Sequence, residues 1–327
     1  MSLFFLLCAL STSPAFAGEQ VGTLTHVHGE VKIFSHPARQ APEGPPPHAL
    51  FEGEHYSVKD AQVGDRVEKG NIVRTATGGR ARVVFENGDQ FVVHPGTAYR
   101  VTWAKDQPVG RAEVKLMYGK IRAVIENGGP RKDLTIKTKA VTMGVRGTDF
   151  FVAEGGPDGG TEITVLRGKV KVTPITIGKV VARAAELKPV EVAAGDTAEA
   201  ALPPKGAAAP VKVTVTRATK EVLTAIQAGT EAAAATPPGD AAIAQRVQKL
   251  EKKALETTLK DIRKTDPKLF AQFSSTEPAQ AAEELHRKQI ESLLPAAPAA
   301  PAARKPRRTE LEDLGGDAYD RYFKMEQ

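Results

Sequence analysis

The sequence predicts a mainly β domain, either a twisted multi-stranded β-sandwich or an irregular β-helix-like stack, followed by a partly disordered α-helical tail. Three observations predict this fold class. From Val21 to about Val192, short runs of β-branched and aromatic residues alternate with turn signals. A pattern centred on glycine recurs within that region. Beyond Pro203, alanine, proline, glutamate and lysine dominate, and helical patterns replace the strand patterns.

The first segment, Met1–Ala17, has the features of an export signal. An apolar run, Leu3–Leu10, is followed by Ala15–Ala17, which has the small-x-small pattern of a cleavage site before Gly18. No Lys or Arg precedes the apolar run, and a short buried helix is the alternative interpretation. Cys8, the only cysteine, lies inside this segment without the small residues that precede an acylated cysteine. We therefore expect a protein of the bacterial periplasm or cell envelope that builds no disulfides.

The remaining chain divides by composition. We expect a β domain over residues 18–202, a linker with weak strand or helix signals over 203–240, helical segments over 241–294 and a disordered tail over 295–327. No stretch after the export signal contains the roughly 20 apolar residues that a transmembrane helix needs.

Turn residues mark several boundaries inside the β domain. Asn87 and Gly88 lie between two alternating runs, and both residue types tolerate the positive φ that a two-residue type I′ hairpin requires. Further turns are expected at Asn127–Pro130 and Pro157–Gly160, and the proline-rich segment His36–His48 is expected to be an exposed loop.

A short sequence pattern that recurs at unequal intervals, called the echo below, indicates how the strands are layered. An aliphatic residue, a glycine and a basic residue recur in similar spacing around Gly29, Gly119 and Gly168. The intervals are unequal, so the echo does not define a regular solenoid repeat. We interpret it as a series of β-arches, in which glycine bends one strand onto the next layer.

In the stretch Lys137–Phe151, the alternation of apolar residues shifts by one position. Val141, Met143 and Val145 share one strand face, but Phe150 falls on the opposite parity. A strand that keeps its core face through such a slip needs one extra residue, which predicts a β-bulge at Gly147.

In a bulged strand, Arg146 and Asp149 lie on the same side, within reach of an ion pair. The alternative is that two separate strands meet at a tight glycine turn, with both charges solvated.

Six residues of this stretch resemble the VRGT(E/D)F signature of the FecR domain family: Val145, Arg146, Gly147, Thr148, Asp149 and Phe150. The resemblance extends over Val21–Leu202, with segments similar to the family's successive strands at Val63–Thr97, Val114–Ala123, Thr161–Val172 and Val190–Glu199. It implies a periplasmic β-rich domain related to a regulator of iron-siderophore uptake. The founding members carry a cytoplasmic segment that controls a sigma factor, then one membrane helix. In this chain the predicted export signal stands in place of the cytoplasmic segment and the membrane helix. Direct control of a sigma factor is therefore not expected, and a signal relay through a partner protein is the form of signalling that stays open.

The tail has two strong helical patterns. Asp240 is expected to cap a helix with one apolar stripe that ends near Pro267, formed by Ile243, Val247, Leu250, Leu255, Leu259 and Ile262. A second helix over Glu277–Leu294 carries Leu285, Ile290 and Leu293, and Arg217–Ala235 is a weaker candidate. Each helix must pack on the β domain or on a partner, or remain partly formed.

The residues that carry chemistry are sparse. We find no phosphate-binding glycine loop, metal-ligand motif or nucleophile elbow, so we expect no enzyme, no catalytic residue, no cofactor and no metal. His26 and His28 share a strand face, and together with His36, His48 or His55 they could bind a metal ion. Histidines at alternate positions of an exposed strand are, however, usually plain surface.

The net charge of +6 is spread along the chain, apart from one basic cluster formed by Arg304, Lys305, Arg307 and Arg308. An exported protein of this kind is not expected to bind nucleic acid.

Three functions follow as hypotheses. The favoured one is a non-enzymatic envelope module that binds a protein partner, with VRGTDF as a fold-defining corner and Arg146, Asp149 and Trp103 as candidate recognition residues. The second is a peptidoglycan- or glycan-binding scaffold that stacks sugars on Trp103, Tyr99 and Tyr118. The third is a partner-mediated signal relay that ends in sigma-factor control.

Overall fold

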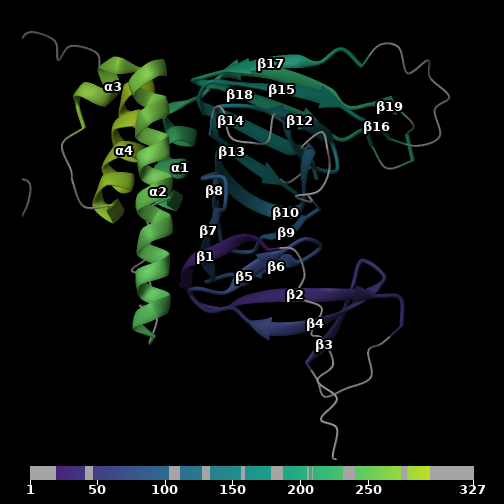
Figure 1. Cartoon of the computed structure of the whole chain (residues 1–327). Helices are drawn as coiled ribbons and strands as arrows, with labels where there is room; N and C mark the ends of the chain where they lie inside the picture. Colours follow the sequence, from purple (N-terminus) through teal and green to yellow (C-terminus); the bar gives the residue numbers. More distant parts are fainter. Residues whose placement is uncertain are drawn as a thin grey trace, which may run out of the picture. The chain divides into compact units, whose positions relative to one another are not determined.

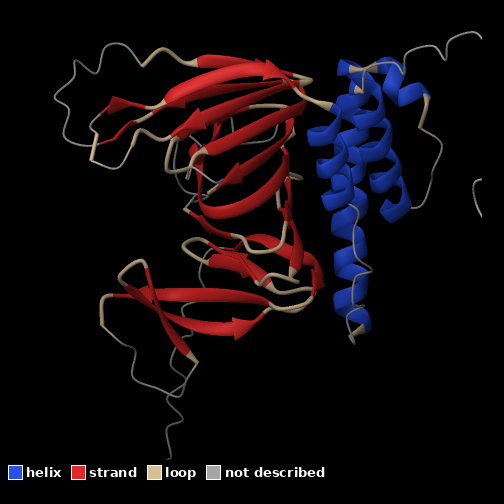
Figure 2. Cartoon of the chain, turned by 180° about the vertical axis from the view of Figure 1, so that it is seen from behind, coloured by secondary structure: helices blue, strands red, loops and turns tan. Residues whose placement is uncertain are grey.

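A computed structural model describes residues 20–40, 47–102, 111–126, 133–155, 159–177, 187–204, 206–207, 209–230, 240–273 and 278–294. The protein is mainly β, with a helical region near the C-terminus, as the sequence predicts (Figures 1 and 2). The expected turn at Asn127–Pro130, the residue Trp103 and the chain after residue 294 lie outside the described residues.

One continuous 18-stranded sheet folds into two layers. Layer A has the order β5 (Arg66–Glu68), β1 (Gln20–His28), β7 (Arg80–Phe85), β8 (Gln90–Val93), the second half of β10 (Arg111–Val124), β13 (Asp149–Glu154), β14 (Thr161–Arg167), β18 (Asp196–Ala201) and β20 (Lys212–Arg217).

Layer B has the order β3 (His48–Phe51), β4 (Glu54–Asp60), β2 (Val31–Ala38), β6 (Ile72–Thr75), β9 (Ala98–Val101), the first half of β10, β11 (Asp133–Lys137), β12 (Val141–Val145), β15 (Lys169–Pro174) and β17 (Val190–Ala193). Only β10 and β11 pair in parallel within this layer. A separate small pair joins β16 (Thr176–Ile177) and β19 (Ala209–Pro210).

The main core lies between the two layers. Alternate residues of each strand point inward, so Leu24, Val83 and Phe91 of layer A meet Ile33 and Tyr99 of layer B in one buried cluster. The structure is therefore a β-sandwich, whose chain crosses repeatedly from one layer to the other.

Glycines at positive φ make these crossings. Gly29 (φ 62°) joins β1 to β2, Gly119 (φ 91°) bends β10 from layer B into layer A, and Gly168 (φ 79°) joins β14 to β15. The expected β-arches at the three echo glycines are thus confirmed. Gly147 (φ 60°) makes the same kind of crossing between β12 and β13.

The β-bulge predicted at Gly147 is wrong. Val141–Val145 pairs within layer B, and Asp149–Glu154 pairs within layer A, so the change of phase marks a change of layer rather than one irregular strand. The alternative of two strands meeting at a glycine turn is correct for the backbone.

Two further local predictions need correction. The hairpin β7–β8 forms, but only Gly88 of its turn has positive φ, so the turn is not type I′. The Phe85 N–H donates to the Asp89 carbonyl at 2.9 Å, which leaves a three-residue loop. In the predicted loop His36–His48, residues as far as Ala38 belong to β2.

Within the described residues, four helices follow the strands: α1 (Lys220–Thr230), α2 (Ala241–Thr265), α3 (Pro267–Ala271) and α4 (Pro278–Leu293). The Asp240 carboxylate accepts from the Ala242 N–H at 2.7 Å, as expected for the N-cap of α2. Val247 of the predicted apolar stripe is buried in the main core, while Ile262 packs with Leu269 and Leu285 of α3 and α4. Among the helices that the structure describes, none has the length and apolarity of a membrane span.

Candidate functional site at the helix-covered face of layer A

The outer face of layer A carries a set of charged and polar side chains that the helices cover. We call this set the polar face, and it consists of Arg82, Gln90, Arg122, Glu126, Asp149 and Arg167. These residues come from five neighbouring strands and their ends, because every second side chain of a strand points away from the core. Figures 1 and 2 show the helices alongside these strands.

Arg122 and Asp149 form the centre of the polar face. The guanidinium donates from Nε to Asp149 Oδ1 at 2.9 Å and from Nη2 to Oδ2 at 2.8 Å. Burial raises the pKa of the Asp149 carboxyl, but the charge and hydrogen bonds of Arg122 lower it further, so the net pKa lies below its usual value. Asp149 therefore remains ionised inside the protein.

The expected pair between Arg146 and Asp149 is wrong. Arg146 is exposed, whereas Asp149 is buried and turns to a strand that is 27 residues earlier in the chain. The arch at Gly147 separates the two residues into different layers, which the continuous-strand interpretation did not anticipate.

Helix α2 brings complementary groups to the polar face. Asp261 forms a buried ion pair with Arg167. The Thr258 hydroxyl donates to the Glu126 carboxylate, and Gln90 Nε2 donates to the same hydroxyl oxygen at 3.3 Å. Burial raises the pKa of Glu126 to about 7, despite the hydrogen bond from Thr258. Asp261 thus contacts one residue of the polar face, and Thr258 contacts two.

A second set of contacts holds the N-terminal half of α2 against layer A. Glu251 lies 2.9 Å from His26 Nδ1 and 3.6 Å from Arg82. Burial raises the pKa of Glu251, but the hydrogen bond from His26 and the charge of Arg82 lower it below its usual value. Arg246 donates to the Gly64 carbonyl at 3.0 Å. His26, which the sequence analysis interprets as plain surface, is half-buried and has a carboxylate partner.

Helix α4 places His286 beside the central ion pair. Burial and the charge of Arg122 hold the pKa of this imidazole well below its usual value, although Asp149 acts in the opposite direction. The imidazole is therefore neutral at neutral pH, and it adds no charge to the Arg122–Asp149 pair.

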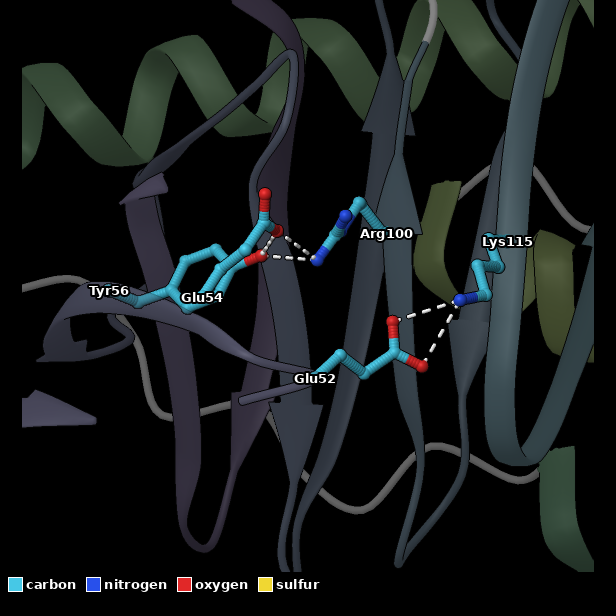
Figure 3. Close-up of polar contacts among 5 residues, drawn as sticks. All are labelled: Glu52, Glu54, Tyr56, Arg100 and Lys115. Carbon is cyan, nitrogen blue, oxygen red and sulfur yellow. Dashed lines mark hydrogen bonds and ion pairs between the residues drawn. The ribbon is translucent and has the colours of Figure 1, made fainter. Parts of the chain in front are cut away.

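The outer face of layer B carries another polar cluster, at the tip of the β3–β4 hairpin. The tip is a two-residue turn in which Glu52 (φ 50°) and Gly53 (φ 81°) both have positive φ. Lys115 donates to Glu52 at 2.9 Å and Arg100 donates to Glu54 at 3.0 Å (Figure 3). These contacts hold the hairpin against β9 and β10.

Aromatic side chains pack below this hairpin. Phe34 contacts both Phe51 and Tyr56, and Phe51 reaches Tyr118 with 6.5 Å between ring centroids. The Tyr56 hydroxyl donates to Glu54 at 2.7 Å, and burial together with this bond raises the pKa of Tyr56 to about 12.

The predicted motif residues have different environments. Val145, Thr148, Asp149 and Phe150 are buried, while Arg146 is exposed. Of the predicted sugar-stacking residues, Tyr99 is completely buried in the main core and Tyr118 is half-buried under the hairpin. Across the described residues, no group of three His, Cys, Asp or Glu side chains could hold a metal ion.

Four residues of the polar face were not predicted from the sequence: Arg82, Arg122, Glu126 and Arg167. A usable signal was present in the run Lys120–Val124, where charged and apolar residues alternate and thus predict one polar strand face. What the pattern could not reveal is that this face is covered by helix residues that lie 94 to 132 residues later in the sequence.

Comparisons with known proteins place this geometry in a family context. The family described as FecR protein matches residues 71–171, a segment that contains Arg122, Asp149 and Arg167. Two crystal structures of a candidate anti-sigma factor from Parabacteroides distasonis ATCC 8503, at 2.50 and 1.65 Å resolution, are similar at 14% identity, with TM-scores of 0.36 and 0.37. Each match covers 47% of this chain and 62% or 63% of the other, so it spans less than two thirds of those structures. No curated protein matches the chain. The chain contains a FecR domain, over residues 71–171.

Proposed function

We propose that this chain is a non-enzymatic module of the bacterial cell envelope that binds a protein partner and takes part in envelope signalling. The observation that carries the proposal is the FecR domain over residues 71–171, because that family is regulatory and envelope-associated. A partner-mediated link to sigma-factor regulation is the form of signalling that the family favours.

We propose Arg146 as a residue that contacts the partner. Val145, Thr148, Asp149 and Phe150 are buried, and Asp149 is paired with Arg122. Arg146 is the one exposed side chain among the six motif residues, and the structure records no ion pair for it among the described residues. A charged side chain that the fold does not use is available for recognition.

Asp149 acts differently in this proposal. Since its carboxylate is buried and holds Arg122, it supports the shape of the corner and does not touch the partner. The proposal therefore keeps VRGTDF as a fold-defining corner and assigns recognition to one of its six side chains.

Site-specific photo-crosslinking in intact cells tests the partner. A crosslinking amino acid at position 146 is expected to capture one envelope protein, and the same amino acid at exposed Arg74 of β6 is the control. The captured protein is then purified, and Arg146→Glu is expected to weaken its binding by about tenfold or more, whereas Arg74→Glu leaves it unchanged.

Two results contradict the proposal. Equal binding by the parent and by Arg146→Glu excludes Arg146 from the interface. A deletion strain with unchanged transcription of envelope-responsive genes argues against a signalling role, even where a partner binds.

The location is proposed separately. N-terminal sequencing of the protein from the envelope fraction is expected to begin at or near Gly18, because Ala15–Ala17 has the pattern of a cleavage site. Recovery of intact Met1 from the cytosol contradicts a periplasmic location.

A further inference from the structure

A cavity of about 790 Å³ lies between α1 and the outer face of layer A, beside the polar face. Phe151 and Ala153 of β13 form one wall, and Val222, Ala225 and Ile226 of α1 form the other. The helix leaves the cavity open to solvent along one side, since Ala225 is exposed although it lines the space. These walls offer an apolar slot of a size suited to a small molecule.

His94 lines this cavity. Its side chain is buried, and Nε2 has no hydrogen-bond partner within the described structure. The ring is held edge-on to Phe151, with 5.3 Å between ring centroids, and its other side faces the backbone of Gly229. A fixed imidazole with an unused nitrogen in a cavity marks the position of a ligand's polar group.

The charges around His94 are positive. Burial, and to a smaller extent the charges of Arg80, Arg122 and Lys120, lower the pKa of the imidazole to about 4. Lys120 is the cross-strand neighbour of His94, because the His94 N–H donates to the Lys120 carbonyl at 3.0 Å. A neutral imidazole N–H in a positive field favours an anionic hydrogen-bond acceptor.

Carboxylates of the lining restrict which anion fits. Glu154 Oε2 accepts a hydrogen bond from the Thr161 hydroxyl at 2.6 Å, whereas its Oε1 is buried without a partner in the described structure. Glu162 lies near Lys120 on the opposite side from His94, and burial together with the charge of Glu199 raises its pKa. A second carboxylate on the ligand would face the carboxyl groups of Glu154 and Glu162 instead of a cation.

We propose that this cavity binds a small monocarboxylate with an apolar body. The carboxylate accepts from His94 Nε2 and lies near Lys120, and the body lies between Phe151 and helix α1. This ligand site is independent of the protein partner proposed above, so either proposal can fail alone.

Four six-carbon probes test the chemistry of the site on the full chain: hexanoate, hexan-1-ol, hexylamine and adipate. Saturable binding of hexanoate is expected in NMR titrations, and the other three are expected to bind about tenfold more weakly or worse, because each lacks the carboxylate or carries the wrong second group. Bound hexanoate is also expected to raise the pKa of His94, measured from its imidazole signals, since Arg80, Lys120 and Arg122 then face a neighbouring anion.

Variants locate the site. His94→Phe keeps the aromatic contact but removes the nitrogen, and Lys120→Met removes the charge; each is expected to weaken hexanoate binding by about tenfold. The matched controls are exposed residues outside the cavity, His28→Phe and Lys171→Met, and these leave binding unchanged. Ala225→Trp, at an exposed position, fills the slot and is expected to abolish binding.

Three results overturn the proposal. The first is an absence of saturable hexanoate binding. The second is binding of hexylamine or hexan-1-ol as tight as that of hexanoate. The third is unchanged binding in a folded Ala225→Trp variant, which remains decisive if His94→Phe fails to fold.

Discussion

Arg122 of β10 and Asp149 of β13 form a two-bond ion pair with side-chain exposures of 0% and 3%. The carboxylate of the VRGTDF motif is thereby connected to an earlier strand of the FecR domain, and not to the arginine of its own motif. Breaking a buried pair leaves one charge uncompensated in a medium of low polarity, which is far more damaging than losing an exposed charge.

The first prediction follows from this contrast. Arg122→Ala is expected to lower the free energy of unfolding by about 3–5 kcal/mol, because Asp149 then stays buried without its partner. Arg146→Ala is expected to change it by less than about 0.5 kcal/mol, since the side chain is exposed. Urea denaturation followed by circular dichroism gives both values.

A double variant separates charge from packing. Arg122→Met with Asp149→Leu removes both charges, and it is expected to recover much of the stability that Arg122→Ala loses. The opposite ranking, with Arg146→Ala unfolded and Arg122→Ala stable, contradicts the ion-pair geometry.

The motif illustrates what could be predicted from the sequence. The parity of Val141, Met143 and Val145 correctly identified one buried face, and the predicted irregularity falls at Gly147, which has a φ of 60°. A break in parity, however, has two physical origins, an inserted residue or a change of layer, and short-range spacing does not distinguish them. The partner of Asp149 depends on strand order, which is a long-range property.

The helices illustrate the same limit. Asp240 and the apolar spacing of α2 are local features, and both were predictable. The ion pair between Asp261 and Arg167 depends on where the helix lies against the sheet, and nothing local encodes that position. An unpaired charge pattern on a helix is usually solvated surface, so its burial is revealed only by the tertiary structure.

The second prediction concerns the glycine arches. A Cβ at Gly168 (φ 79°) would lie 2.6 Å from the Gly147 carbonyl oxygen, so one arch packs against the next. Gly168→Ala is therefore expected to destabilise the protein by more than the roughly 1–2 kcal/mol of backbone strain alone. Gly70→Ala has a similar φ of 85° with open space around it, and it measures the strain without the clash.

Thermal unfolding of these two variants checks the packing of the arches. Equal melting temperatures would show that the neighbouring arch adjusts freely. Gly147→Val, at φ 60°, is expected to be destabilising as well, because a β-branched side chain is poorly tolerated at positive φ.

The third prediction concerns the dependence of stability on pH. Burial raises the pKa of Glu126 to about 7 in the folded protein, whereas the unfolded chain has its ordinary value near 4.5. Between these two values the folded state binds more protons, so the free energy of unfolding falls as the pH rises from about 4.5 to 7. The contribution is lost above pH 7 and fully present below about 4.5.

Glu126→Gln tests this dependence. The substitution removes the titrating group but keeps an oxygen that accepts a hydrogen bond from Thr258. The fall in the free energy of unfolding between pH 4.5 and 7 is therefore expected to be smaller than in the parent, by up to about 3 kcal/mol. Glu256→Gln, at an exposed position of the same helix, is the control. Parallel curves for the parent and Glu126→Gln contradict the assignment.

The last prediction concerns the boundary expected at residue 202, which stays a prediction. Beyond it, β20 pairs with β18 along six residues, and Val211 is buried in the main core. Helices α2 and α4 then cover the buried ion pairs of the polar face. A chain that ends at 202 would expose Arg122, Asp149 and Arg167 together with an unpaired edge of β18.

Three chains that start at residue 18 and end at 202, 218 or 294 test this boundary. We expect the chain ending at 294 to unfold cooperatively at the urea midpoint of the full chain. The chain ending at 218 restores β20 but leaves the polar face uncovered, so a lower midpoint is expected, and the chain ending at 202 is expected to lose cooperative unfolding. If the chain ending at 202 is as stable as the full chain, the helices are a separate element and the boundary expected from composition is correct.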